Sequence, residues 1–365
     1  MTETSKLQFE KDTDGNFYHD LKLRILPLMS GIQRKATVLT WVKIILFPSA
    51  YLFVYILLMT HAEKLWHLYL GYAIFGMLMP LNVVNIVHDA IHGCLLKNKT
   101  GNFLARHVLD VLGGNSYVWQ KRHVVFHHPT PNVIDWDIDI ERRKLYTLSP
   151  ADDHKQFHRY QHLYMPFVFP LFTLHWVLFR DFKDYFDPQS MFRRKVKVPK
   201  IEFIKLPFFK TIYLLHIIVM PIVLLDFPWY HIILAFIVLH VIAAIGALII
   251  LLPNHWDEDA EFHHPVGGRI EESWAVYQFR NTNDFAIENG VANFLMGGLN
   301  HHVAHHLFPG VNHNYLPGIT KEVISIAREK GMHYKCFSLT QAIATHFRLL
   351  KKNGFKYNLL EEAFE

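Results

Sequence analysis

The stretch GGLNHHVAHHLFPG, residues 297–310, determines the fold that we expect for this chain. It puts His302 three and four positions before His305 and His306, and residues at these spacings are neighbours on one face of a helix. Imidazole is the commonest side-chain ligand for metal ions near neutral pH. Three imidazoles on one helical face therefore form part of a coordination shell.

Two further clusters of histidines occur earlier in the chain. His88 and His92 lie four residues apart in HDAIH, and the segment HVVFHH contains His123, His127 and His128. A single histidine pair is weak support for a metal site, because histidines also occur in protein cores and at membrane interfaces. Eight histidines in three separated clusters favour one site that is assembled from distant parts of the sequence.

Composition places the chain among membrane proteins with a sizeable aqueous part. Apolar residues make up 51% of the 365 residues and charged residues only 19%, and the charges avoid long segments. The net charge of +5 fits a cytoplasmic membrane surface, and the basic residues are too scattered for a nucleic-acid site. Two distant cysteines, Cys94 and Cys336, argue against a structural disulfide and are consistent with a reducing compartment. The charged N-terminus predicts no cleaved signal peptide.

Four apolar segments are long enough, with their flanks, for membrane helices. We expect them to form two hairpins, which comprise residues 37–60 with 65–87, and residues 211–225 with 227–256. Lys and Arg are rare in the two hairpin turns and frequent before, between and after the hairpins. By the positive-inside tendency, the histidine clusters and both termini lie on the cytoplasmic side.

Residues 163–179 are also uncharged, but they contain Pro166 and Pro170. Histidine clusters that share one site must leave the bilayer on the same side. This requires an even number of crossings between the second and third clusters. We therefore predict that residues 163–179 form an interfacial or re-entrant helix.

The expected fold is an all-α integral membrane protein with four transmembrane helices and a cytosolic helical cap. Within the cap, Ser338 and Gln341 have the spacing of a capping box and predict the start of a helix that ends near Lys352. The expected segments are an N-terminal cytosolic segment 1–36, a membrane region 37–256 with a cytosolic insertion 88–206, and a C-terminal cap 257–365.

The number of histidines indicates two metal ions rather than one. A zinc site needs four ligands when it is structural and three when it is catalytic. Eight or nine imidazoles with few cysteines fit two first-row metals better, and iron is the usual choice for oxygen chemistry.

The three clusters resemble the histidine boxes of the membrane fatty acid desaturases and their hydroxylase relatives, which bind two iron ions. The segments HDAIHG, HVVFHHPTPNVIDWDIDI, WAVYQFRNTNDFA and GGLNHHVAHHLFP are similar to the acyl desaturase branch that includes the front-end desaturases. The resemblance covers about residues 65–335. It implies that the iron ligands are His88, His92, His123, His127, His128, His302, His305 and His306. It also implies a ninth ligand at the end of the last transmembrane helix, where His255 stands in LPNHWDED, although an interfacial histidine is the alternative there.

The chain departs from the front-end pattern at three positions. Many front-end desaturases have glutamine where His302 stands, His301 replaces a residue that is often aromatic, and Tyr277 stands where relatives often have histidine. The sequence contains no haem-binding HPGG stretch. We therefore expect electrons to come from a separate donor, such as a ferredoxin or a b-type cytochrome. We expect His263 and His264 at the surface.

Two further sets of residues are weaker candidates. Carboxylates often orient the histidines that bind a metal, and candidates for this role are Asp89, Asp135, Asp137 and Asp139, with Glu288 as a further one. Loop solvation and helix capping explain these carboxylates almost as well. Possible lining residues of a substrate tunnel are Trp119, Trp136, Trp274 and Phe285, for which an ordinary aromatic core is the alternative.

The function implied by the resemblance is the O2-dependent insertion of a double bond into a fatty acyl chain. The acyl group could be carried by coenzyme A, by acyl carrier protein or by a lipid ester, and the position of the double bond is open. Hydroxylation, acetylene formation and terminal alkene formation would use the same ligands. A histidine-rich metal transporter is an alternative from another class, but transporters place ionisable ligands within their spans, whereas these clusters lie beyond the span ends.

Overall fold

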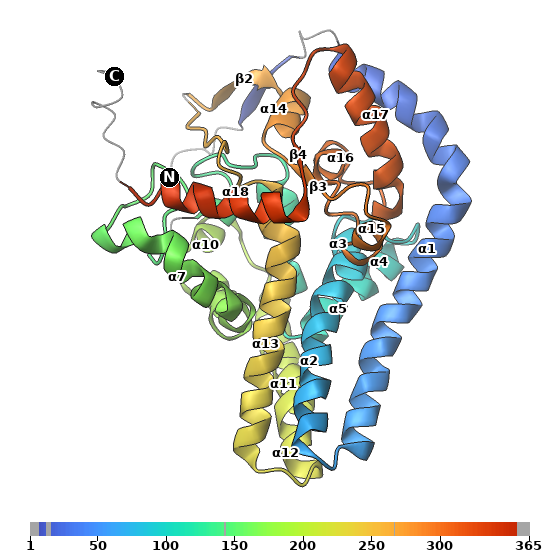
Figure 1. Ribbon diagram of the computed structural model, residues 1–365, viewed down its shortest axis with the longest axis vertical. Coiled ribbons are helices and arrows are strands. Elements are labelled where there is room, and N and C mark those ends of the chain that lie inside the picture. The colour runs from blue at the N-terminus through green and yellow to red at the C-terminus, as the bar shows by residue number, and fades with distance from the viewer. Residues whose placement is uncertain (1–6, 12–15, 142–143, 266, 356–365) are drawn as a thin grey trace.

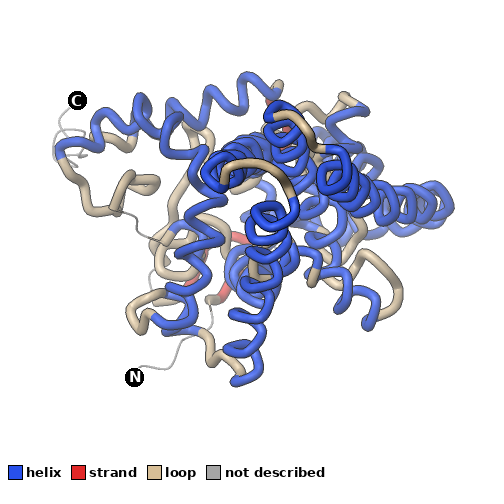
Figure 2. Tube along the Cα trace, turned by 90° about the horizontal axis from the view of Figure 1, so that it is seen from below, coloured by secondary structure: helices blue, strands red, loops and turns tan. Residues whose placement is uncertain are grey.

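The computed structural model describes residues 7–11, 16–141, 144–265 and 267–355, so parts of both predicted terminal segments lie outside the described residues. Long helices form a stem, and short helices with two small sheets form a cap at one end of it (Figure 1). Seen from the opposite end, the stem helices appear nearly end-on (Figure 2).

The first hairpin of the stem consists of α1, Phe17–His61, and α2, Leu65–Asn82. Without a break, α2 continues through a π-helical turn, η1, Val83–Val87, into α3, His88–Ile91. The predicted span at residues 37–60 is only the second half of α1. The first turns of α1 belong to the cap, because Phe17 and Leu21 pack against Leu316 and Ile319.

The second hairpin consists of α11, Lys200–Leu214, with its continuation through η7, Leu215–Val219, and α12, Met220–Leu224, and of α13, Trp229–Leu251. Tyr72 and Phe75 of α2 pack with Ile232 and Leu239 of α13 in the largest apolar core. Apolar side chains on the outer surface of the stem are exposed, as expected for helices that face lipid tails.

Five helical segments of the described chain are long and apolar enough to cross a membrane, one more than the four predicted spans. The additional segment is Gln156–Lys195, which includes the predicted interfacial residues 163–179. Its α-helical course is interrupted at Phe169–Leu171, which contains Pro170, whereas Pro166 lies inside an α-helical piece. Its pieces are η4, Gln156–Tyr160; α7, Gln161–Val168; η5, Phe169–Leu171; α8, Phe172–His175; η6, Trp176–Arg180; α9, Asp181–Phe186; and α10, Met191–Lys195. In Figure 1, α7 lies obliquely beside the stem.

The cap contains the remaining short elements. Between the hairpins lie α4, Lys99–Arg106; α5, Val108–Val111; α6, Ser116–Gln120; η2, Lys121–His127; and η3, Ile138–Ile140. After α13 come η8, Leu252–Asn254; α14, Trp274–Arg280; α15, Gly290–Leu295; α16, His302–Leu307; η9, His313–Tyr315; α17, Leu316–Glu329; and α18, Leu339–Lys352. The predicted capping box is confirmed, because the Ser338 side chain accepts from Gln341 N and the Gln341 side chain accepts from Ser338 N.

The prediction of an entirely helical chain is correct only in outline. Two parallel two-stranded sheets join distant parts of the cap: β1, Gln8–Glu10, pairs with β2, Arg269–Ser273, and β3, Asp284–Phe285, pairs with β4, Cys336–Phe337. Strands of two to five residues have too little alternation of apolar and polar residues to be recognised from sequence.

The close contact between α2 and α13 depends on Gly76. A Cβ atom at this position would lie 2.5 Å from the Leu239 carbonyl oxygen. We expect Gly76→Ala to destabilise the protein by about 1–3 kcal/mol, because the two helices must move apart. Gly31→Ala on exposed α1 is the matched control: a Cβ there meets nothing within 4 Å. Thermal unfolding in detergent should show a lower Tm for Gly76→Ala alone, and equal Tm values for both variants would contradict this account.

Candidate metal centre

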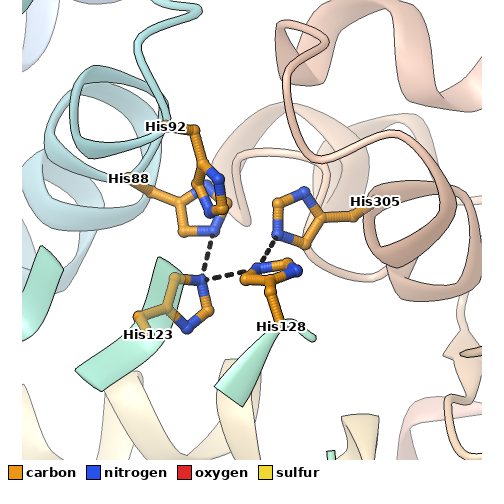
Figure 3. A group of neighbouring side chains, drawn as sticks. All are labelled: His88, His92, His123, His128 and His305. Atoms are coloured by element: carbon orange, nitrogen blue, oxygen red, sulfur yellow. Dashed lines mark hydrogen bonds between the residues drawn. The ribbon is translucent and has the colours of Figure 1, made fainter. Parts of the chain in front are cut away.

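All nine predicted histidines converge where the cap covers the end of the stem, and they form two groups. The first group is His88, His92, His123, His128 and His305. The second group is His127, His255, His302 and His306. Within each group, one nitrogen of every ring lies within 4.8 Å of the others. Figure 3 shows the rings of the first group turned toward one another.

A π-helical turn divides the second histidine cluster between the two groups. In η2 the backbone N–H of His128 donates to the carbonyl oxygen of His123, five residues earlier, at 3.0 Å. In a π-helix, residues five apart come close to one face, whereas an α-helix aligns residues three and four apart. His123 and His128 therefore reach the same group, while His127 points into the other.

The third cluster is divided in the same way by the α16 helix. His302 and His306, four residues apart, join the second group, and His305 joins the first. Asp284 holds the start of this helix, because its Oδ1 atom accepts from Val303 N at 2.7 Å. Gly297, with φ of +59°, brings the preceding loop so close to η1 that a Cβ there would lie 2.3 Å from the Val84 carbonyl oxygen.

Hydrogen bonds fix the tautomers of two histidines in the second group. His127 Nδ1 lies 3.0 Å from Asp137 Oδ2, and His255 Nδ1 lies 2.9 Å from the Asn281 carbonyl oxygen. Both partners only accept, so each Nδ1 carries a proton, and in the neutral ring each Nε2 presents a lone pair. The two Nε2 atoms nevertheless face each other at 2.9 Å.

His306 is oriented by Gln278. The Gln278 amide Nε2 donates to the His128 carbonyl oxygen at 2.8 Å, so its Oε1 accepts from His306 Nδ1 at 2.9 Å. The remaining nitrogen, His306 Nε2, is buried and has no hydrogen-bond partner among the described residues, and the same holds for His92 Nε2.

This donor set fits metal ions. Opposed lone pairs at 2.9 Å repel each other unless a cation lies between them. Two imidazole nitrogens that bind one metal at about 2.1 Å and at right angles lie about 3 Å apart. The five Nε2–Nε2 contacts across the site, at 2.8–3.1 Å, match this separation.

The protonation states agree with metal binding. Burial, reinforced by the charges of neighbouring histidines, lowers the pKa of His128, His302, His305 and His306 well below the usual value. Neutral imidazole is the form that coordinates metals. His127 is the exception: burial lowers its pKa, but the charge and hydrogen bond of Asp137 outweigh burial and raise it.

Two of the predicted carboxylates contact histidines directly. Asp137 Oδ2 accepts a hydrogen bond from His127 Nδ1, and Asp89 Oδ1 lies 3.4 Å from His88 Nδ1. Asp139 Oδ2 lies 4.0 Å from His127 Nδ1 and is also held by Arg122 and Arg180.

The other two carboxylates point elsewhere. Asp135 is exposed, and its backbone carbonyl accepts from Lys195. Glu288 is exposed in the loop that follows β3.

Of the four predicted tunnel residues, Trp119 lies closest to the histidines, with its ring stacked on His123 at a centroid distance of 5.7 Å. The other three occupy different surroundings: Trp136 packs in a cluster with Val133 and Tyr277, Trp274 packs edge-on against Tyr18, and Phe285 is fully buried in β3. A role of these residues in a substrate tunnel stays a prediction.

The structure also shows the contacts of His301 and Tyr277, two of the residues that depart from the front-end pattern. His301 points away from the site and bonds Thr320 and Asn293, each at 3.0 Å. The Tyr277 hydroxyl donates to the Pro131 carbonyl oxygen at 2.6 Å. His264 is exposed, whereas His263 is only partly exposed and lies 3.3 Å from Asn281.

Several residues that support the site were not identified from the sequence. They are Gln278, Asn281, Asp284, His313 and Lys43. Asn281 acts through its backbone, so its side chain could not have identified it. Gln278 and Asp284 stand in WAVYQFRNTNDFA, but spacing alone does not distinguish them from their polar neighbours.

The lowered pKa values make the metal-free protein sensitive to acid. As pH falls below about 6.5, four histidines with lowered pKa values gain protons in the unfolded chain but not in the folded one. They are His128, His302, His305 and His306. Each therefore lowers the free energy of unfolding by about 1.4 kcal/mol per pH unit, and His127, with its raised pKa, acts in the opposite direction. Denaturant unfolding of metal-free protein should show lower stability at pH 5.5 than at pH 7.5. His306→Gln should reduce this difference, and an unchanged difference in the variant would contradict the lowered pKa of His306.

Comparisons with known proteins agree with this geometry. The model of the family described as "Fatty acid desaturase" matches residues 64–338 of this chain. It is 30% identical to an sn-1 linoleoyl-lipid 6-desaturase of Arthrospira platensis over 321 residues, which cover 87% of this chain and 84% of the relative. A protein of the same description from Synechocystis is 27% identical, covering 78% of this chain and 80% of the relative. An acyl-lipid (8-3)-desaturase of Physcomitrium patens is 29% identical over 74% of this chain and 57% of that protein.

The family match, over residues 64–338, spans the segments that carry all nine histidines. The expected resemblance is confirmed, and the enzyme is an oxidoreductase of lipid metabolism. The chain belongs to the membrane-bound fatty acid desaturase family.

Proposed function

We propose that the two histidine groups bind two iron ions, and that the enzyme uses them to insert a double bond into the acyl chain of a membrane lipid. The observation that carries this proposal is the meeting of nine imidazoles, eight of them buried, from distant parts of the chain. Five contacts between their Nε2 atoms measure 2.8–3.1 Å, and Asp137 and the Asn281 carbonyl hold the protons of His127 and His255 on Nδ1, away from one of these contacts. Iron suits nitrogen ligands in sites of oxygen chemistry.

The reaction requires a metal because the C–H bonds of an alkyl chain are too weakly acidic for any side-chain base. When bound, the irons supply the O2-dependent oxidising power. Two hydrogens leave the acyl chain and, with two electrons from a donor and two protons, reduce O2 to two molecules of water.

The residues of the chain hold and shield this chemistry. Asp137, Asn281 and Gln278 keep three imidazoles in the tautomer that offers Nε2. Partners of this kind typically affect metal affinity or activity 10–100-fold. Burial of the histidines excludes bulk water from the reacting groups.

The names of the relatives support an acyl lipid as substrate rather than a soluble thioester. We assign electron supply to a separate redox protein, such as a ferredoxin or a b-type cytochrome. The relatives differ in the position at which they introduce the double bond, so the regiochemistry of this enzyme is a matter for product analysis.

We further propose that four helices cross the membrane and that Gln156–Lys195 lies at its cytoplasmic surface. The metal ligands follow directly after α2 and shortly after α13, so both helices end on the same side. A fifth complete crossing between His128 and His255 would put these ends on opposite sides. The breaks at Phe169–Leu171 and the oblique direction of α7 support the same topology (Figure 1).

Lipid profiling tests the proposed activity. A host that expresses the wild type should accumulate a new unsaturated acyl species, and a host that expresses His305→Ala should not, because one ligand of the first group is lost. His301→Gln is the matched control. It replaces a histidine in the same segment whose ring contacts Thr320 and Asn293 rather than the metal site, so this variant should retain most of the product.

Two results would contradict the proposal. Recovery of only a hydroxylated acyl chain would replace the desaturase by a hydroxylase. An equal loss of product in His305→Ala and His301→Gln, with both proteins folded, would show that the cluster acts by structure rather than by metal binding.

A further inference from the structure

A lysine is buried within the apolar part of α1, where a charge is costly. Lys43 is 1% exposed, although its neighbours in sequence are apolar and the helix is long enough to cross a membrane. Ionisable residues in such segments are rare and usually functional. Lys43 Nζ lies 2.8 Å from His313 Nε2 and 4.8 Å from the ring centroid of Phe294.

The contacts of His313 have a defined direction. A lysine ammonium only donates, so His313 Nε2 accepts and His313 Nδ1 carries the proton. This Nδ1 donates to Asp89 Oδ2 at 2.8 Å, and the backbone N–H of His313 donates to the same oxygen at 3.0 Å. The other oxygen, Asp89 Oδ1, lies 3.4 Å from His88 Nδ1.

The four residues form one buried chain from α1 to a histidine of the first group. Lys43 comes from α1, His313 from η9, and Asp89 and His88 from α3. All four side chains are at most 2% exposed. The positive charge at one end and the carboxylate near the other compensate each other through a neutral imidazole, so neither charge is left alone in the interior.

We infer that Lys43 and His313 are positioning residues for His88. They hold the Asp89 carboxylate in one orientation, with Oδ2 accepting from His313 and Oδ1 facing His88 Nδ1, so that His88 presents Nε2 to the metal. This inference rests on the proposed function and adds two residues to it, one of them about 45 positions before the first histidine box.

A role in stability alone does not account for the buried polar contacts from Lys43 to His88. Replacing buried ion pairs by apolar residues of similar size is often neutral or stabilising. Apolar side chains at positions 43, 89 and 313 would fill the same space without the cost of burying charge. The contact with His88 is what the polar chain adds.

The test compares variants of the full-length protein purified in detergent and loaded with 57Fe. Lys43→Met removes the ammonium at similar length. His313→Asn keeps a donor near Asp89 but loses the contact with Lys43. Lys43→Gln, which retains a neutral donor at position 43, is the more conservative second variant. Lys35→Met, at an exposed position of the same helix, is the matched control.

The readouts are iron bound per chain, the Mössbauer spectrum and thermal unfolding of the iron-free protein. The wild type and Lys35→Met should bind two irons. Lys43→Met and His313→Asn should bind one iron 10–100-fold more weakly, with altered parameters for that site only. The double variant should show no further loss, because both residues act through Asp89.

The outcomes separate the inference from the proposed function. If the wild type does not bind two irons, the proposed function fails, and the inference fails with it. If the wild type binds two irons and the folded Lys43→Met and His313→Asn variants give the same iron content and spectrum, the inference alone is overturned. If these variants and Lys43→Gln all aggregate while Lys35→Met folds, the contacts from Lys43 to His88 are needed for folding rather than for orienting His88. The inference is then likewise overturned.

Discussion

The structure depends on bringing together the nitrogen lone pairs of nine imidazoles in one buried space. Hydrogen bonds to Asp137, Asn281 and Gln278 occupy the outer nitrogens of three rings and leave their inner nitrogens without protons. Such an arrangement is repulsive by itself, and burial increases the repulsion because water cannot screen it. Two bound cations, as proposed above, would remove this repulsion, so that metal binding would stabilise the fold of this end of the molecule.

Helices and tight turns hold the histidines in this arrangement. The two hairpins of the stem bring the ends of α2 and α13 together, and these carry His88 and lead to His255. The π-helical turn η2 sends His127 to one group and its neighbour His128 to the other. Gly297 allows the third cluster to pack directly on η1. Small changes in any of these elements would displace several nitrogens at once.

The sequence predicted eight of the histidines because they carry their own chemistry in clusters at close spacing, and the resemblance to the desaturases added His255. It also predicted both hairpins, since long apolar runs are the clearest signal that a membrane imposes. It did not predict that α1 begins at Phe17, because the first turns of that helix pack on the cap and not in lipid. The apolar run of residues 163–179 predicts one helix, whereas the structure breaks it into α-helical, 3-10 and π-helical turns.

The supporting residues were harder to predict, for a physical reason. Gln278 and His313 act by contacts with residues far away in the chain, and Asn281 acts by its backbone alone. Lys43 could have been noticed as a single charge inside an apolar run, but only the fold shows that its partner is His313. Sequence spacing reports neighbours on one helix, and these contacts join different elements.

The central claim is that each histidine group encloses one iron. Anomalous difference density collected on either side of the iron absorption edge, from crystals of protein purified from iron-replete cells, tests this most directly. The account predicts two iron peaks, one among His88, His92, His123, His128 and His305 and one among His127, His255, His302 and His306. A single peak, or two peaks that do not change across the iron edge, would contradict it.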